Sequence, residues 1–180
     1  FSLQRTVCLK EAPPKLRIIL LSTLRLLDPA NRTALGNYEG FIDINISKNS
    51  YSSSILPMLD SHLNADNNSK YINSEKTPLT TLDSVAGTYL NEFSNCFIKI
   101  DTQGYESQVL DGAFKTLKSA RGVLCELTLV PLYEGQVMWR DLIFRLEKEG
   151  FVLWSLERGF TDSYNGRALQ LDGLFLKKDD

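Results

Sequence analysis

The sequence predicts an α/β protein built around a mostly parallel sheet that ends in an antiparallel hairpin. Three observations lead to this class. In the second half of the chain, strand-like and helix-like segments alternate, which is the order of βαβ crossovers. The segment Gly122–Val130 is almost continuously apolar, as parallel strands covered on both faces are. Two strand-like segments then close the chain without a helix between them, which indicates an antiparallel pair.

The composition is that of an ordinary globular domain. The chain has 180 residues, enough for one domain with a sizeable core, and 43% of them are hydrophobic. Its 20 basic and 22 acidic residues give a net charge of −2, so no basic excess points to nucleic acid or an anionic membrane surface. No apolar run reaches transmembrane length, and no signal peptide is recognisable. We therefore expect neither nucleic acid nor a membrane as a partner.

The cysteines and the histidine limit the chemistry of the chain. Cys8, Cys96 and Cys125 are odd in number, far apart and form no C-x-x-C pair. We expect reduced, mostly buried thiols, which are typical of a cytoplasmic protein. The single histidine, His62, argues against a histidine-rich metal site, and we expect no metal. His62 itself is expected on the surface or in a loop, rather than as a catalytic base.

The first half of the chain gives the weaker signals. Leu16–Leu27 has apolar residues at helical spacing, but the run Ile18–Leu21 could equally be a buried strand. Phe41–Ile46 alternates apolar and polar residues, as a half-buried strand does. Residues 47–76 are rich in Ser, Asn, Asp and Lys, which predicts a long surface excursion with one helical turn near Leu56–His62.

The elements after this excursion are read from shorter signals and from periodicity. Thr77–Leu82 predicts a short strand, and Asp83 is expected to cap a helix that runs to about Phe93. The remaining elements follow in order: strand Cys96–Ile100, helix Tyr105–Ser119, strand Gly122–Val130, helix Val137–Glu149 closed by Gly150, strand Phe151–Leu156 and strand Ala168–Leu176.

Acidic residues mark the predicted site, because open parallel sheets bind ligands beyond the carboxyl ends of their strands. Asp101 directly follows a strand, and Gly104 lets the backbone approach a ligand closely. Asp101 could bind a hydroxyl, act as a general base or merely cap the next helix. Glu106 could act there or only favour the helix N-terminus. Glu126 and Asp172 lie in apolar strands, so each needs a partner or a wet cleft.

A loop after the strand Gly122–Val130 adds further candidates. Tyr133, Glu134 and Gln136 follow that strand at its carboxyl end and could line a substrate pocket. The alternative is a loop without function. No P-loop and no G-x-G-x-x-G motif occurs in the chain.

One block resembles a known family. Phe97–Ala113 reads as a strand ending Lys-Ile-Asp, then x-x-Gly-Tyr-Glu, then a helix with x-x-Val-Leu-x-Gly-Ala. It resembles the signature block of the FkbM-type S-adenosylmethionine-dependent methyltransferases. The similarity continues through Glu126–Gln136 and, more loosely, covers about residues 31–176.

The resemblance implies a Rossmann-like methyltransferase fold and S-adenosylmethionine as the methyl donor. It implies O-methylation of a hydroxyl on a sugar, glycan or secondary metabolite. The site residues that follow from it fall into three roles. The catalytic residues are Asp101, Glu106 and Glu126; the cofactor-binding residues are Ala34, Leu35 and Asp101; the substrate-binding residues are Tyr133, Glu134 and Gln136.

The chain departs from the family's pattern in its first segment. A D-x-G-A-N-x-G-type loop, whose glycines let the backbone approach the cofactor, is not present, and residues 1–30 contain no glycine. We therefore expect an N-terminally truncated member, with residues 1–30 poorly matched and residues 31–180 forming the C-terminal portion of a methyltransferase domain. The alternative function is a non-catalytic binding or assembly module. An uncovered strand edge would favour pairing with a second copy of the chain, so a homo-oligomer is among the expected partners.

Overall fold

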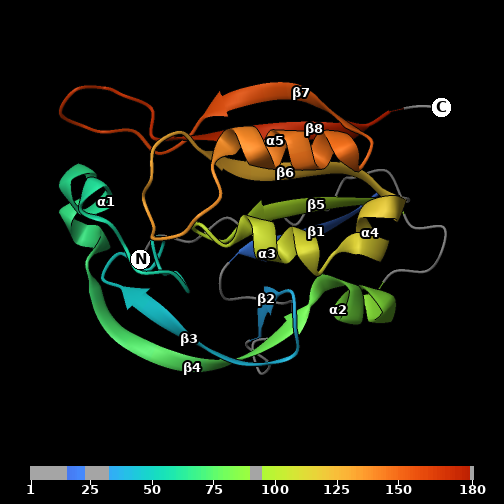
Figure 1. Ribbon diagram of the computed structural model, residues 1–180, viewed down its shortest axis with the longest axis horizontal. Helices are drawn as coiled ribbons and strands as arrows, with labels where there is room; N and C mark the ends of the chain where they lie inside the picture. Colours follow the sequence, from blue (N-terminus) through green and yellow to red (C-terminus); the bar gives the residue numbers. More distant parts are fainter. Residues whose placement is uncertain (1–15, 23–32, 90–94, 179–180) are drawn as a thin grey trace.

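The computed structural model describes residues 16–22, 33–89 and 95–178, and these form two sheets with helices beside them (Figure 1). The larger sheet has five strands in the order β1-β5-β6-β8-β7. Its strands are β1 (Leu16–Ser22), β5 (Asn95–Asp101), β6 (Ala120–Thr128), β8 (Gln170–Lys177) and β7 (Phe151–Arg158). Of the segment Leu16–Leu27, which was compatible with helix or strand, the described part Leu16–Ser22 is a strand, and the remainder lies outside the described residues.

Parallel and antiparallel pairings are equally represented in this sheet. Strands β1, β5 and β6 pair in parallel, whereas β8 is antiparallel to both β6 and β7. The prediction of a mostly parallel sheet is therefore wrong, although the antiparallel pair at the end of the chain is present. The reason is that β8 returns directly from β7 without a helical crossover and inserts between β7 and β6, so that it runs against both neighbours.

A second, three-stranded sheet has the order β2-β4-β3. Its strands are β2 (Ala34–Gly36), β4 (Tyr71–Thr81) and β3 (Gly40–Ser47). Strand β4 begins well before the short strand expected from Thr77, because its polar first half pairs with β3. Part of the predicted surface excursion is therefore regular structure, and its helix, α1, spans Asp60–Ala65.

Helices cover one face of the five-stranded sheet, with α3, α4 and α5 on the same side in Figure 1. The bounds of these and of the remaining helix are α2 (Leu82–Tyr89), α3 (Glu106–Asp111), α4 (Phe114–Ser119) and α5 (Trp139–Lys148). The segment expected as one helix is split between α3 and α4. Gly112 lies at this break, where its backbone packs against strand β2: a Cβ at Gly112 would lie 2.0 Å from the Gly36 carbonyl oxygen.

Asp83 caps a helix other than the one predicted. Its carboxylate accepts hydrogen bonds from the backbone N–H groups of Lys115 and Thr116, at 2.9 and 2.8 Å, at the start of α4. The helix that contains Asp83, α2, is instead capped by Thr81, whose hydroxyl oxygen accepts from the Ser84 N–H at 3.1 Å. Asp83 therefore joins two helices that are separate in sequence.

The main core lies between the five-stranded sheet and its helices. Alternate residues of β5 and β6 point into it and are fully buried, Ile98 and Ile100 among them. They belong to a cluster with Val109 and Leu110 of α3 and Leu142 of α5. The residues between them along the strands face the opposite side of the sheet, so the polar residues of β5 and β6 share that side.

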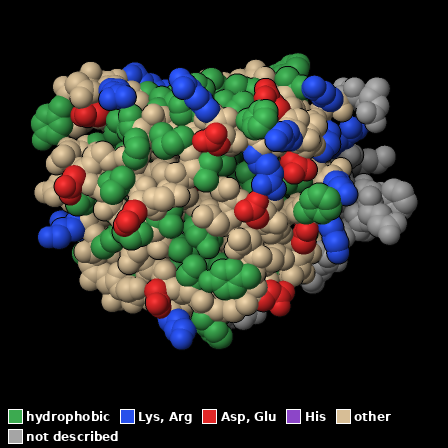
Figure 2. Space-filling model, viewed as in Figure 1, with side chains coloured by type: hydrophobic (Ala, Val, Ile, Leu, Met, Phe, Trp, Pro, Cys, Tyr) green, Lys and Arg blue, Asp and Glu red, His purple; other side chains and the backbone are tan. Residues whose placement is uncertain are grey.

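The helix-covered side of the molecule carries surface charges of both signs. Figure 2 shows Lys and Arg side chains interspersed with Asp and Glu over this face. Among the described residues, no helix is both long and apolar enough to cross a membrane. Cys96 and Cys125 are buried free thiols, as expected, whereas Cys8 lies outside the described residues. The expected partners and compartment remain predictions.

Candidate functional site

Four acidic residues lie side by side across the five-stranded sheet, and we call Asp101, Glu126, Asp172 and Glu157 the carboxylate row. Ile100 of β5 is in register with Cys125 of β6, so the next residues, Asp101 and Glu126, are neighbours. The register of β8 then places Asp172 beside both Glu126 and Glu157. The row crosses the sheet where β5 ends, as the sequence predicts for Asp101.

The Asp101 side chain is partly exposed to solvent. Its side chain is 30% exposed, and its Oδ2 lies 3.2 Å from the ammonium nitrogen of Lys99. Its other oxygen, Oδ1, accepts a hydrogen bond of 3.0 Å from the side-chain amide of Gln103. Asp101 therefore presents a charged group, oriented from two directions, to the solvent side of the strand end.

Glu126 is held by two amides on a single oxygen. Its Oε2 accepts hydrogen bonds from Gln103 Nε2 at 3.0 Å and from Gln170 Nε2 at 2.7 Å. Burial and the neighbouring carboxylates, Asp101 foremost, raise the pKa of Glu126 well above its usual value, and the hydrogen bond from Gln103 works in the opposite direction. Because Oε2 is an acceptor of two hydrogen bonds, the proton of the neutral form resides on Oε1.

Glu106 lies behind the row and organises the loop that carries it. Its side chain is 1% exposed. Its Oε1 accepts from the N–H and hydroxyl of Thr102, at 3.0 and 3.1 Å, and from the N–H of Gly104 at 3.1 Å. Burial raises the pKa of Glu106, while these hydrogen bonds favour the ionised form. The structure thus gives Glu106 a loop-holding position, and its predicted catalytic role stays a prediction.

The three predicted acceptor-side residues have different positions. Tyr133 is 1% exposed, and its hydroxyl donates to Gln103 Oε1 at 2.9 Å. Gln136 Oε1 accepts from the N–H groups of Leu132 and Tyr133, which closes their own loop. Glu134 is exposed, and its N–H donates to the Pro57 carbonyl at 2.8 Å. Among the described residues, Tyr133 alone of these three is linked to the row by a hydrogen bond, through Gln103.

The two predicted cofactor contacts in β2 lie apart from the row. Ala34 and Leu35 are buried, at 4% and 8% exposure, and belong to two different hydrophobic clusters. Leu35 shares its cluster with Ile100, the residue before Asp101. Their predicted contact with a cofactor stays a prediction.

Two functional candidates, Gln103 and Gln170, were not predicted from the sequence. Each lies two residues from a predicted acid, Gln103 after Asp101 and Gln170 before Asp172. In a strand, residues two apart share a face, and this spacing was the available signal for Gln170. Gln103 lies beyond the strand end, so its contact with the row depends on the turn that follows.

His62 is buried, so the prediction of a surface or loop histidine is wrong. Its side chain is 2% exposed and packs against Tyr133, with ring centroids 5.1 Å apart, and against Phe160, at 4.9 Å. Its Nδ1 is a buried atom without a described hydrogen-bond partner. Burial lowers the pKa of His62 to about 4, with the charge of Asp66 acting in the opposite direction.

We expect this burial to make the protein less stable as the pH falls from about 6.5 to about 4. The unfolded chain takes up a proton at His62 near pH 6.5, whereas the folded chain does so only near pH 4. The stabilisation is therefore complete above pH 6.5 and lost below it, by about 3 kcal/mol in total.

The measurement is urea unfolding of the wild type and His62→Phe at pH 7.5 and pH 4. The chain has one histidine, so the difference between the two proteins isolates its titration from that of the carboxylates. The wild type should lose stability relative to His62→Phe on acidification. An equal difference at both pH values would contradict the buried, neutral His62.

The described part of the chain contains no group of three or more His, Cys, Asp and Glu side chains arranged to hold a metal ion. The carboxylate row is extended across strands, and its closest described partners are amides and one ammonium group. Carboxylates can interact with cationic groups and accept hydrogen bonds from hydroxyl groups.

Fold and site together define an α/β protein with carboxylates where its central parallel strands end, the place at which such sheets bind ligands. The model of the methyltransferase FkbM domain matches residues 10–153. The chain therefore belongs to the FkbM methyltransferase family, which confirms the resemblance read from Phe97–Ala113. No curated protein and no solved structure gave a significant match.

Proposed function

We propose that this chain is an S-adenosylmethionine-dependent O-methyltransferase with a Rossmann-like fold, acting on a hydroxyl of a sugar, glycan or secondary metabolite. Family membership supports methyl transfer as the reaction class. The single observation that carries the site is the partly exposed carboxylate of Asp101 at the end of β5, joined through Gln103 to Glu126.

The residues present fit the charge of the proposed donor. S-adenosylmethionine carries a sulfonium and an ammonium group, and the carboxylate row offers negative charge at the sheet edge. Asp101 would hold the donor from this side. Ala34 and Leu35, both buried, would support the donor from the core, through the packing of Leu35 in one cluster with Ile100.

When bound, S-adenosylmethionine supplies an electrophilic methyl group. Asp101 would accept the proton of the acceptor hydroxyl as that oxygen becomes the nucleophile. Glu126, in its neutral form, would donate a hydrogen bond from Oε1 to an acceptor oxygen. Tyr133 would fix the amide between these two groups, while Glu134 and Gln136 would shape the acceptor side, and Glu106 would hold the loop in place.

The test is donor binding and methyl transfer by the whole 180-residue chain. Titration calorimetry with S-adenosylmethionine should show saturable binding, and methyl-labelled donor should label a hydroxylated acceptor from a panel of sugars, oligosaccharides and polyols. S-adenosylhomocysteine, which lacks the methyl group, should compete for binding without labelling. If neither form binds, the chain is a non-catalytic member of the family, and the proposed activity fails.

A further inference from the structure

We infer that Gln103 is a positioning residue that holds Asp101 and Glu126 at a fixed separation, and that Tyr133 acts through it. This inference rests on the proposed function, since Asp101 and Glu126 are the groups that it orients. Three side-chain hydrogen bonds carry it: from Gln103 Nε2 to Asp101 at 3.0 Å and to Glu126 at 3.0 Å, and from Tyr133 to Gln103 Oε1 at 2.9 Å.

The orientation of the Gln103 amide is determined from both ends. Each hydrogen of its NH₂ group meets a carboxylate oxygen, and its carbonyl oxygen accepts from the Tyr133 hydroxyl. The reverse orientation would place the amide oxygen against two carboxylates and its NH₂ group against a hydroxyl. The two carboxylates therefore select the amide orientation, and the Tyr133 hydroxyl, which also lies 3.3 Å from the Ser52 carbonyl oxygen, is compatible with it.

The backbone of Gln103 is also held in an unusual conformation. Its φ is +53°, in the left-handed region that a residue with a side chain rarely adopts. The Ser54 hydroxyl donates to the Gln103 carbonyl at 2.7 Å. The residues on either side, Thr102 and Gly104, donate to the buried Glu106. Such a conformation persists when its surroundings over-determine it, and it is common where side-chain placement matters for function.

A bridging amide has a defined effect on the two acids. A hydrogen-bond donor favours the ionised form of a carboxyl group, so the amide opposes the rise in the pKa of Glu126 that burial and Asp101 cause. Among the described side chains, the surroundings of the pair are acidic apart from one ammonium group. The charged and titratable groups that face it are Lys99, Glu106, Cys125, Tyr133, Glu157 and Asp172.

The variant Gln103→Met tests the bridge, because Met has a similar length and makes no such hydrogen bonds. The ¹³C resonance of the Glu126 carboxyl, assigned with Glu126→Gln, reports its titration without requiring activity. Loss of the donor should raise the midpoint of that titration by about one pH unit. Tyr133→Phe should shift it in the same direction by less, and the double variant should match Gln103→Met.

Two comparison variants separate positioning from folding. Gln170→Met removes a donor to Glu126 but leaves the link to Asp101, so it should raise the Glu126 titration while kcat falls less than in Gln103→Met. Gln103→Gly removes the amide where glycine is favoured by the positive φ, so it should retain the wild-type melting temperature and share the titration shift.

Methyl transfer provides the second readout. In Gln103→Met, kcat should fall about 10²-fold with little change in the KM for the donor. An unchanged Glu126 titration in Gln103→Met and Gln103→Gly would overturn the inference, as would additive shifts in the double variant. If the wild type transfers no methyl group, the proposed function fails, and the titration still decides whether Gln103 positions the pair.

Discussion

Asp101→Asn should reduce methyl transfer by about 10²- to 10⁴-fold, the usual contribution of a general base. Asn keeps an oxygen that can accept from Gln103 but cannot take a proton, and it removes the charge facing Lys99. Because that ion pair is partly exposed, its loss should change the free energy of unfolding by only about 0–1 kcal/mol. The effect should therefore appear in turnover and not in folding.

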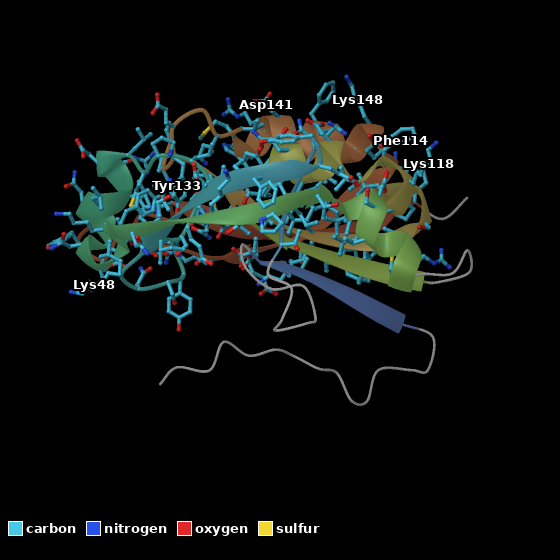
Figure 3. All side chains as sticks on the ribbon, turned by 90° about the horizontal axis from the view of Figure 1, so that it is seen from below. Lys48, Phe114, Lys118, Tyr133, Asp141 and Lys148 are labelled. Atoms are coloured by element: carbon cyan, nitrogen blue, oxygen red, sulfur yellow. The ribbon has the colours of Figure 1, made fainter. Side chains whose placement is uncertain are left out.

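The measurement is the initial rate of methyl transfer, together with thermal unfolding of the same samples. Asp141→Asn is the matched control, since Asp141 is an exposed carboxylate on α5, at the outer surface in Figure 3 and far from Tyr133. This control should retain wild-type turnover. Wild-type turnover in Asp101→Asn as well would remove Asp101 from the catalytic role and leave it as a structural partner of Lys99.

Gly112→Ala should destabilise the protein by about 3 kcal/mol, near the upper end of the usual cost of overpacking. The added Cβ would lie 2.0 Å from the Gly36 carbonyl oxygen and 3.0 Å from its carbonyl carbon. These are backbone atoms of β2, so no rotamer change can relieve the contact. The Gly112 carbonyl also accepts from the Asp83 N–H at 2.9 Å, so a displaced Gly112 would disturb that hydrogen bond too.

The change is read from the midpoint of urea unfolding. Gly166→Ala is the control, because a Cβ at Gly166 meets nothing within 4 Å, although its φ of +72° disfavours alanine. That control should cost about 1 kcal/mol from backbone strain alone. Equal losses in the two variants would mean that the approach of Gly112 to β2 has no energetic significance.

The elements of the second half could be predicted because their hydrophobic periodicity is strong. Strands β5 and β6 and helix α5 lie within a couple of residues of their predicted bounds, and Gly150 ends α5 with a φ of +86°. These segments pack on the main core, so burial selects their apolar residues and leaves a periodic signal in the sequence.

The pairing of the strands could not be predicted in the same way. The first half of β4, Tyr71–Lys76, is polar and mostly exposed, and it is a strand because β3 supplies its hydrogen-bond partners. The antiparallel insertion of β8 between β6 and β7 likewise depends on partner choice, which periodicity does not encode. The strands of the second half were therefore predicted correctly, but the parallel arrangement was assigned to too many of them.

The same difference between local and tertiary signals applies to the candidate site. Asp101 and Glu126 could be predicted as candidates because an acid at a strand end or in an apolar strand is informative by itself. The importance of Gln103 lies in contacts to three residues from different parts of the chain, 101, 126 and 133. The burial of His62 likewise follows from rings contributed by Tyr133 and Phe160. Such roles arise from tertiary structure and leave no local signature.

Asp83 couples the unfolding of helix α2 to that of helix α4. Its backbone lies in the first turn of α2, and its carboxylate satisfies the free N–H groups of Lys115 and Thr116 at the start of α4. Any local unfolding that frays the first turn of α2 also exposes those amides to solvent, so the two helices open as one unit. Because α4 follows α3 and the loop of Asp101, opening of this unit would extend along the chain toward the strand-end site.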